Sequence, residues 1–183
     1  MRFPFDTIKS VAAIKLVLSN MDEKLCNFHK LFKILYFSEK QHLSRYGRSI
    51  TGDKYIAMKD GPVPSSIYDI LKILRGTPSV IKTSIDWSHD FEVRENHYLK
   101  MINSEFDMDI FSESEIECLS QSIAENKNLS FTILRDHSHD SAWESANQND
   151  EMSIFDIAKA GGANDEIIKY IAIVCENHSV TVN

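Results

Sequence analysis

The segment from Asp22 to Tyr46 constrains the fold more than any other part of the sequence. Its apolar residues recur at helical spacing and cover two sides of the predicted helix: Phe28, Leu31, Phe32, Ile34, Leu35 and Phe37. That spacing predicts one long helix. A helix that is apolar on two sides needs neighbours packed against both of them. We therefore predict that this helix lies at the centre of the fold.

The remaining segments predict a mainly α (α+β) protein. Further helices are expected over these parts of the chain: about Asp6–Met21, the stretch after Pro64, a capping-box helix from Ser112, a helix from Ser130, Ser153–Ala160 and Asn164–Asn177. Short strands are expected at Tyr55–Met58 and in a hairpin of Phe91–Arg94 with Tyr98–Ile102. The sequence has no internal repeat or linker. We therefore predict a single helical domain over residues 1–183, with a small antiparallel β-sheet or hairpin against the central helix.

The charge balance argues against nucleic acid as a partner. The chain has 20 Lys and Arg residues against 27 Asp and Glu residues, a net charge of -7. Duplex DNA binding depends on cationic side chains that displace counterions from phosphates, and an acidic chain lacks that attraction. The lysines of the first quarter alternate with apolar residues, and we interpret them as a solvated helix face: Lys9, Lys15, Lys24, Lys30, Lys33 and Lys40.

The cysteines and the N-terminal segment predict a cytoplasmic protein. Cys26, Cys118 and Cys175 are odd in number and far apart, which is not the pattern of a secreted disulfide framework. Each lies in an apolar stretch, so we expect all three to be buried core residues. No long uncharged run follows the N-terminus, since Lys9 and Lys15 interrupt the first helix. Neither a signal peptide nor a membrane span is expected.

The histidines invite a metal or catalytic hypothesis, which the spacing does not favour. His137 and His139 are two positions apart, and side chains at that spacing point to different sides of a helix. The chain has no nucleophile elbow and no glycine-rich phosphate loop. We expect a protein that is not an enzyme and that binds no metal or cofactor. The catalytic alternative is a hydrolase that uses His139 with Asp140 or Asp136.

The segment Lys59–Pro64 is the most distinctive loop in the sequence. Gly61 permits an unusual backbone angle and the two prolines fix the entry into the next helix, so the segment reads as a rigid turn. A stiff surface loop also loses little entropy when a partner docks on it. Trp143 either anchors its own loop against the core or faces a partner, since tryptophan is enriched at binding hot spots. Both interpretations of each feature stay open from these residues alone.

Three segments together resemble the Panacea domain, also known as the SocA-like antitoxin domain. The first is Lys33–Lys40 with His42-Leu43 and Tyr46-Gly47-Arg48, which looks like the "K-L-L-Y-F-A-Q" helix of the family. The second is Tyr55–Pro64 with Ile67-Tyr68, similar to the "A-x-x-x-G-P-V" turn and the helix after it. The third runs from Leu129-Ser130 through Leu134 to Ser138-His139 and Trp143, and resembles the "L-S … T-H … W" region. The resemblance covers roughly residues 7–146.

The resemblance implies an antitoxin that neutralises a cognate protein toxin by direct binding, with the toxin encoded by an adjacent gene. Members of the family are associated with prophage regions and with toxins of several unrelated kinds. One member class acts instead as an adaptor that delivers its toxin to a cytosolic protease, and this is the alternative function. The sequence identifies neither the toxin nor the mechanism. The candidate partner-binding residues are Lys59, Asp60, Gly61, Pro62, Val63, His139 and Trp143.

Overall fold

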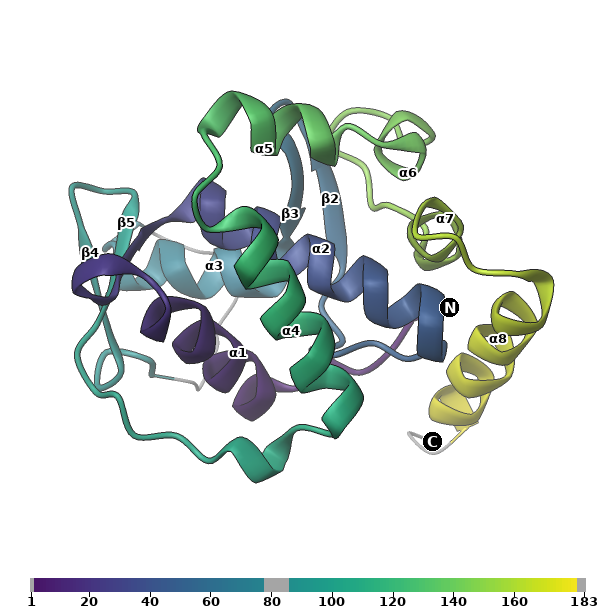
Figure 1. The fold of residues 1–183 in the computed structure, drawn as a ribbon, viewed down its shortest axis with the longest axis horizontal. Helices are drawn as coiled ribbons and strands as arrows, with labels where there is room; N and C mark the ends of the chain where they lie inside the picture. The colour runs from purple at the N-terminus through teal and green to yellow at the C-terminus, as the bar shows by residue number, and fades with distance from the viewer. Residues whose placement is uncertain (1, 78–85, 181–183) are drawn as a thin grey trace.

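The structure, a computed structural model, describes residues 2–77 and 86–180. In chain order its helices are α1 (Thr7–Ser19), α2 (Phe28–Tyr46), α3 (Ser65–Leu74), α4 (Glu113–Asn126), α5 (Phe131–Ser138), α6 (Ser141–Glu144), α7 (Ile154–Ala160) and α8 (Asp165–Val180) (Figure 1). Its strands are β1 (Leu25–Asn27), β2 (Tyr55–Met58), β3 (Gly61–Pro64), β4 (Phe91–Arg94) and β5 (Tyr98–Met101). Two short 3-10 turns, η1 (Asp22–Lys24) and η2 (Met108–Ile110), complete the order. The predicted fold class, mainly α with a small antiparallel sheet, is confirmed.

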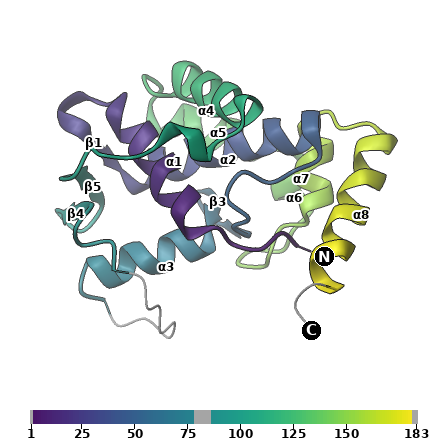
Figure 2. The same ribbon diagram turned by 90° about the horizontal axis from the view of Figure 1, so that it is seen from below.

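Helix α2 lies at the centre of the fold, as predicted. Figure 2 shows α4 on one side of α2 and α3 on the other. The N-terminal half of α2 packs into a core with α1, α3 and α4, and its residues Leu31 and Ile34 are fully buried there. Its C-terminal half packs against β2, α7 and α8, where Tyr36 is also fully buried. Because α2 contributes to both parts of the core, its burial holds the described structure together.

The start of α2 differs from the prediction. We expected one helix from Asp22, whereas α2 begins at Phe28 and is preceded by η1 and β1. Glu23 and Lys24 adopt positive φ angles of 52° and 53°, which an α-helix does not allow. Asn27 then caps α2, because its side chain accepts a hydrogen bond from the backbone N–H of Lys30 at 2.8 Å.

The segment after β2 is a strand rather than a simple turn into α3. Gly61–Pro64 forms β3, which pairs antiparallel with β2, with Ala57 opposite Pro62 and Tyr55 opposite Pro64. Neither proline can donate a backbone hydrogen bond, so the prediction treated both as turn residues. On its other edge β2 pairs with residues 149–152: the N–H of Asn149 donates to the carbonyl of Ala57 at 2.8 Å, and Ile56 bridges Glu151.

The other predicted strands and caps are confirmed. Strands β4 and β5 form the expected hairpin, and β1 adds to it in the order β1-β5-β4. Ser112 and Glu115 form the predicted capping box at the start of α4. Cys26, Cys118 and Cys175 are buried, as expected. Among the described helices, none is both long and apolar enough to cross a bilayer.

Two of the lysines interpreted as a solvated face are in fact buried. Lys15 is 3% exposed; its Nζ lies 2.5 Å from Asp90 and donates to the carbonyl of Glu105 at 2.7 Å. Lys33 is 1% exposed, and it donates to a backbone carbonyl of β3. A lysine at helical spacing next to apolar residues can place its stem in the core when an acceptor is in reach of its ammonium group. The sequence does not show where those acceptors lie.

Candidate functional site

The three motif segments meet at the loop between β2 and β3. Figure 1 shows the β2–β3 hairpin ending beside α5, with α6 following it. Lys59 and Asp60, which link the two strands, are exposed. Gly61 and Pro62 are buried beneath them, and Val63 is half-buried. Of the five predicted residues in this loop, Lys59 and Asp60 are therefore the ones whose side chains are exposed.

Two side chains from elsewhere in the chain hold this loop by its backbone. The indole N–H of Trp143 donates to the carbonyl of Met58 at 3.0 Å. The Nζ of Lys33 donates to the carbonyl of Pro62 at 2.9 Å. His29 lies close to the backbone of Asp60 at the tip of the loop, but its buried Nε2 has no hydrogen-bond partner among the described residues. The loop is thus held on both sides.

Gly61 is required both by its backbone angle and by its surroundings. Its φ angle is +96°, in the region that favours glycine. A Cβ built at this position would overlap Ser138 Oγ, and it would lie 2.9 Å from both Cε and Nζ of Lys33. The sequence prediction of an unusual backbone angle at Gly61 is confirmed, and the close approach of Lys33 and Ser138 adds a second reason for glycine.

His139 lies beside the loop and stacks on Trp143. The two ring centroids are 3.7 Å apart and the planes differ by 3°. The Nε2 atom of His139 is buried and has no hydrogen-bond partner among the described residues. Burial, and then the charge of Lys33, lower the pKa of His139 below its ordinary value. The stacking on His139 and the hydrogen bond to Met58 show that Trp143 anchors its own loop, which was one of its two predicted roles.

Asp140 joins this region to the motif on α2. Its carboxylate accepts hydrogen bonds from the hydroxyl of Tyr36 at 2.9 and 3.0 Å and from Nζ of Lys40 at 2.7 Å. It also caps α6 by accepting from the N–H of Ala142 at 3.1 Å. In the described part of the chain, no hydrogen bond joins Asp140 to His139, the pair named in the hydrolase alternative.

Comparison with known protein families identifies these segments. The model of the family described as "Antitoxin SocA-like, Panacea domain" matches residues 31–144, more than half of the chain. The chain belongs to this SocA-like antitoxin family. The predicted resemblance is confirmed, and the match contains all seven candidate partner-binding residues of the Panacea domain. No curated protein and no solved structure matches the chain.

Two residues of the site were missed by the sequence prediction. His29 lies just before the matched Panacea segment, and Phe131 lies within it. Their rings pack with centroids 4.0 Å apart, which joins α5 to α2. Burial, and then the charge of Lys33, lower the pKa of His29 to about 4, so its imidazole is neutral at pH 7. His29 lies four residues before Lys33, which places both on one face of α2, but a single histidine on a helix is not a distinctive pattern.

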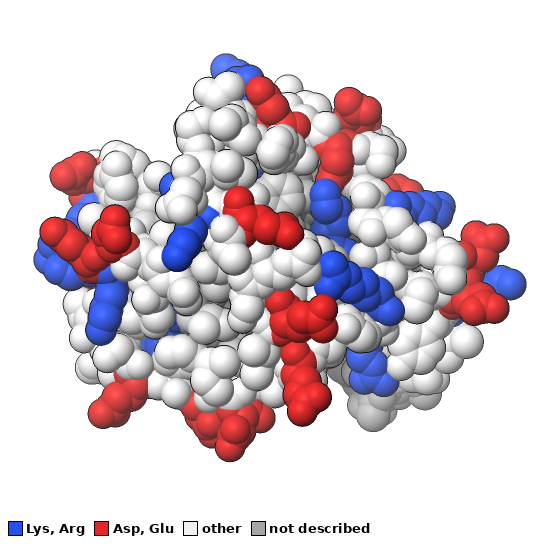
Figure 3. Space-filling model, viewed as in Figure 1, with Lys and Arg blue, Asp and Glu red and all other residues white. Residues whose placement is uncertain are grey.

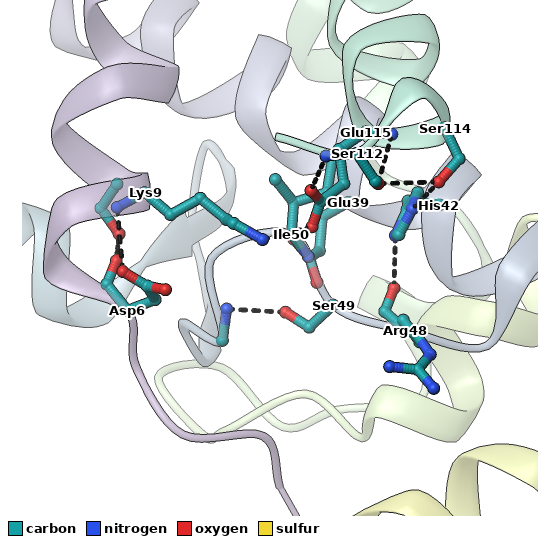
Figure 4. Close-up of polar contacts among 12 residues, drawn as sticks. Asp6, Lys9, Glu39, His42, Arg48, Ser49, Ile50, Ser112, Ser114 and Glu115 are labelled. Atoms are coloured by element: carbon teal, nitrogen blue, oxygen red, sulfur yellow. Dashed lines mark hydrogen bonds and ion pairs between the residues drawn. The ribbon is translucent and has the colours of Figure 1, made fainter. Parts of the chain in front are cut away.

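A separate cavity of this Panacea chain lies near the C-terminal end of α2. It has a volume of about 810 Å³ and lies between α1, α4 and the loop after α2. Figure 4 shows how its polar side chains engage one another. Lys9 pairs with Glu115 at 2.8 Å, and His42 contacts Ser114 Oγ at 3.0 Å and the carbonyl of Arg48 at 2.7 Å. No group of three potential metal ligands gathers anywhere in residues 2–77 and 86–180.

A buried carboxylate beside this cavity gives a testable pH dependence. Glu39 is 3% exposed and accepts a hydrogen bond from the N–H of Ile50 at 3.1 Å (Figure 4). Burial raises the pKa of Glu39 from 4.5 to about 7. Between those two pH values the folded protein keeps a proton that the unfolded chain has lost, so this group's contribution to stability falls as pH rises.

We expect Glu39→Gln to stabilise the protein at pH 8 by about 2 kcal/mol and to change little at pH 4.5. The amide keeps an oxygen that can accept from Ile50, and it removes the cost of ionising a buried carboxyl group. Urea unfolding of both proteins at the two pH values measures the difference. An equal effect of the substitution at both pH values would show that Glu39 has an ordinary pKa.

Proposed function

We propose that this SocA-like antitoxin neutralises a cognate protein toxin by direct binding, through the loop between β2 and β3 and the helices beside it. We call this region the loop surface and define it by Lys59, Asp60, Phe131, His139 and Trp143. The observation that carries the proposal is the fixed loop: two side chains hold its backbone while its two charged tip residues stay exposed.

A fixed loop favours binding because little conformational entropy is lost when a partner docks. The side chains that hold the loop are contributed by α2 and α6, which are anchored in the core through Tyr36 and Asp140. The binding surface is therefore preorganised by the same residues that stabilise the fold. Specificity for one toxin then depends on the exposed side chains, which can vary without disturbing that support.

The proposed mechanism requires no chemical step. Asp140 is occupied by Tyr36, Lys40 and the start of α6, and the buried Nε2 of His139 faces no hydrogen-bond partner among the described residues. A general base needs a hydrogen-bonded path to the proton that it removes. This arrangement supports a binding role for His139 and Asp140 over the hydrolase alternative.

Growth rescue tests the proposal. Each gene adjacent to this one is expressed in a bacterial host, alone and with the antitoxin, and colony formation is measured. We expect one toxic neighbour, rescued by the wild type and not by Lys59→Glu with Asp60→Lys. The control reverses an exposed charged pair on β4 (Glu92→Lys with Arg94→Glu) and should rescue fully. Failure to rescue any toxic neighbour counts against the proposal, and rescue through a shortened toxin half-life would indicate the protease adaptor instead.

A further inference from the structure

The cavity near the C-terminal end of α2 holds a serine and a histidine in direct contact. Ser114, in the first turn of α4, places its Oγ 3.0 Å from Nε2 of His42 on α2. Figure 4 shows the two side chains pointing toward each other. Both line the cavity of about 810 Å³. A hydroxyl within hydrogen-bond reach of an imidazole is the arrangement of a serine nucleophile and its general base.

The other ring nitrogen of His42 determines which way the hydrogen bond to Ser114 runs. Nδ1 lies 2.7 Å from the carbonyl oxygen of Arg48, which only accepts, so Nδ1 carries the hydrogen. Burial lowers the pKa of His42 below its ordinary value, so the imidazole is neutral at pH 7. Its Nε2 therefore accepts from the hydroxyl of Ser114. His42 is 2% exposed, so the core fixes its orientation. A backbone carbonyl thus orients the base, as a carboxylate does in the serine protease triad.

The start of α4 supplies further hydrogen-bond donors beside Ser114. The first N–H groups of a helix have no partner within it. Those of Glu113 and Ser114 donate to no acceptor in the part of the chain that the structure describes. Such N–H groups stabilise the negative oxygen that forms when a hydroxyl attacks a carbonyl group. Ser112 Oγ lies 3.0 Å from Ser114 Oγ and accepts from the N–H of Glu115, so its own hydrogen is free to point at Ser114.

The walls of the cavity set the kind of molecule that fits beside this pair. Phe3, Ile50 and Phe111 are buried apolar residues of its lining. Lys9 is neutralised by Glu115 at 2.8 Å. The other charged residues of the lining are exposed: Asp6, Arg48 and Asp109. The volume lies within the range of small-molecule pockets, roughly 300–1,000 Å³. The apolar part of the lining suits a short, uncharged acyl chain.

We propose that Ser114 and His42 form a hydrolytic site for small carboxylic esters, with the carbonyl of Arg48 orienting the histidine. Ser114 Oγ attacks the carbonyl carbon of the ester while its proton passes to Nε2 of His42. The C–O bond to the alcohol then breaks, and the departing alcohol oxygen takes that proton, which leaves the acyl group on Ser114. Water attacks the acyl carbon and gives one proton to Nε2. The bond to Oγ then breaks, Oγ recovers the proton, and a carboxylic acid is released.

This activity goes beyond the proposed toxin binding and uses a different part of the molecule. The loop surface lies at α5 and α6, whereas the Ser114–His42 pair lies between α4 and the end of α2. The prediction that the protein is not an enzyme rested on the absence of local motifs. Ser114 and His42 are 72 positions apart, so the packing of α4 on α2 brings them together and no local motif marks them.

Covalent labelling tests the serine without any toxin. The full chain is incubated with a fluorophosphonate probe, which phosphonylates activated serines, and the modified residue is identified by peptide mass spectrometry. We expect a label on Ser114 that is lost in Ser114→Ala. Ser120→Ala is the control, since it replaces an exposed serine of the same helix and should keep the label. Thermal unfolding checks that both variants fold. An unlabelled Ser114 in the folded wild type, or equal labelling of Ser120, overturns the proposal.

Hydrolysis of p-nitrophenyl butyrate measures the whole reaction. We expect Ser114→Ala and His42→Gln to lower kcat at least about 100-fold, the usual effect of losing a nucleophile or a general base. Glutamine can still donate to the carbonyl of Arg48, but it cannot take up a proton at pH 7. If His42→Gln does not fold, Ser114→Ala decides alone. Wild-type hydrolysis no faster than buffer, or an unchanged rate in Ser114→Ala, contradicts the proposal. Neither result bears on growth rescue, so the two functions are tested separately.

Discussion

Gly61→Ala is expected to lower the free energy of unfolding by about 3 kcal/mol, since it adds backbone strain and a steric overlap. The positive φ angle of +96° is strained for alanine. The new methyl group would also displace Ser138 Oγ and the end of Lys33, whose ammonium group is buried and bonded to Pro62. Displacement of Lys33 breaks its hydrogen bond to the carbonyl of Pro62. We therefore expect the affinity for the toxin to fall together with the free energy of unfolding.

Gly76→Ala is the matched control. Gly76 has a similar φ angle of +79°, but a Cβ there meets no atom within 4 Å. We expect Gly76→Ala to cost about 1 kcal/mol, the backbone strain alone. Urea unfolding of the two variants measures the difference. If both variants lose the same stability, the close packing of Lys33 and Ser138 around Gly61 is not what requires glycine.

Asp140→Ala is expected to lower the free energy of unfolding by about 3 kcal/mol, the sum of a lost helix cap and an unpaired buried hydroxyl. Asp140 caps α6 and accepts from the hydroxyl of Tyr36, a fully buried side chain. It also pairs with Lys40, a smaller contribution because both side chains are partly exposed. Because Asp140 links α2 to α6, its replacement should also break the hydrogen bond from the indole N–H of Trp143 to the carbonyl of Met58.

Asp6→Ala is the control that measures the loss of a helix cap alone, without the contacts that Asp140 makes with Tyr36 and Lys40. Asp6 is exposed and caps α1 by accepting from the N–H of Lys9 at 2.9 Å. Its replacement should cost about 1 kcal/mol, the usual value for a lost cap. Chemical unfolding compares the two variants. If Asp140→Ala and Asp6→Ala lower the free energy of unfolding equally, the contact between Asp140 and Tyr36 contributes nothing to stability.

The sequence predicted the parts of this structure that depend on local periodicity. The apolar spacing along α2 placed it at the centre, and the Ser112–Glu115 pair located the start of α4. The hairpin of β4 and β5 was also predicted, from two short segments that flank Glu95-Asn96-His97. These features are encoded by residues within one or two turns of each other, so a single sequence is enough to find them.

The parts that were missed depend on partners far along the chain. Strand β1 exists because it pairs with β5, some 70 residues later, and β3 contains two prolines that weaken any strand prediction. Likewise, Lys33 was read as solvated because its acceptor, the carbonyl of Pro62, is supplied by another element. Long-range pairing overrides local propensity at these positions.

The sequence predicted some residues of the candidate site but not the contacts that hold them together. The loop and Trp143 were singled out from residue type, and the structure brings them together through the bond to Met58. His29 was not, because a single histidine on an apolar helix carries no distinctive pattern. Its place in the site depends on the ring of Phe131, which another helix supplies. Such a contact is visible once the fold is known.

The most direct test of the central claim is the dissociation constant between this antitoxin and the toxin whose effect on growth it reverses, measured by titration calorimetry. Lys59→Glu with Asp60→Lys is compared with the control pair Glu92→Lys with Arg94→Glu, and both keep the net charge. We predict that the loop variant binds about 30-fold more weakly or worse, as expected for hot-spot residues, while the control binds as wild type does. Unchanged affinity in a folded loop variant would contradict the assignment of the loop surface as the toxin-binding site.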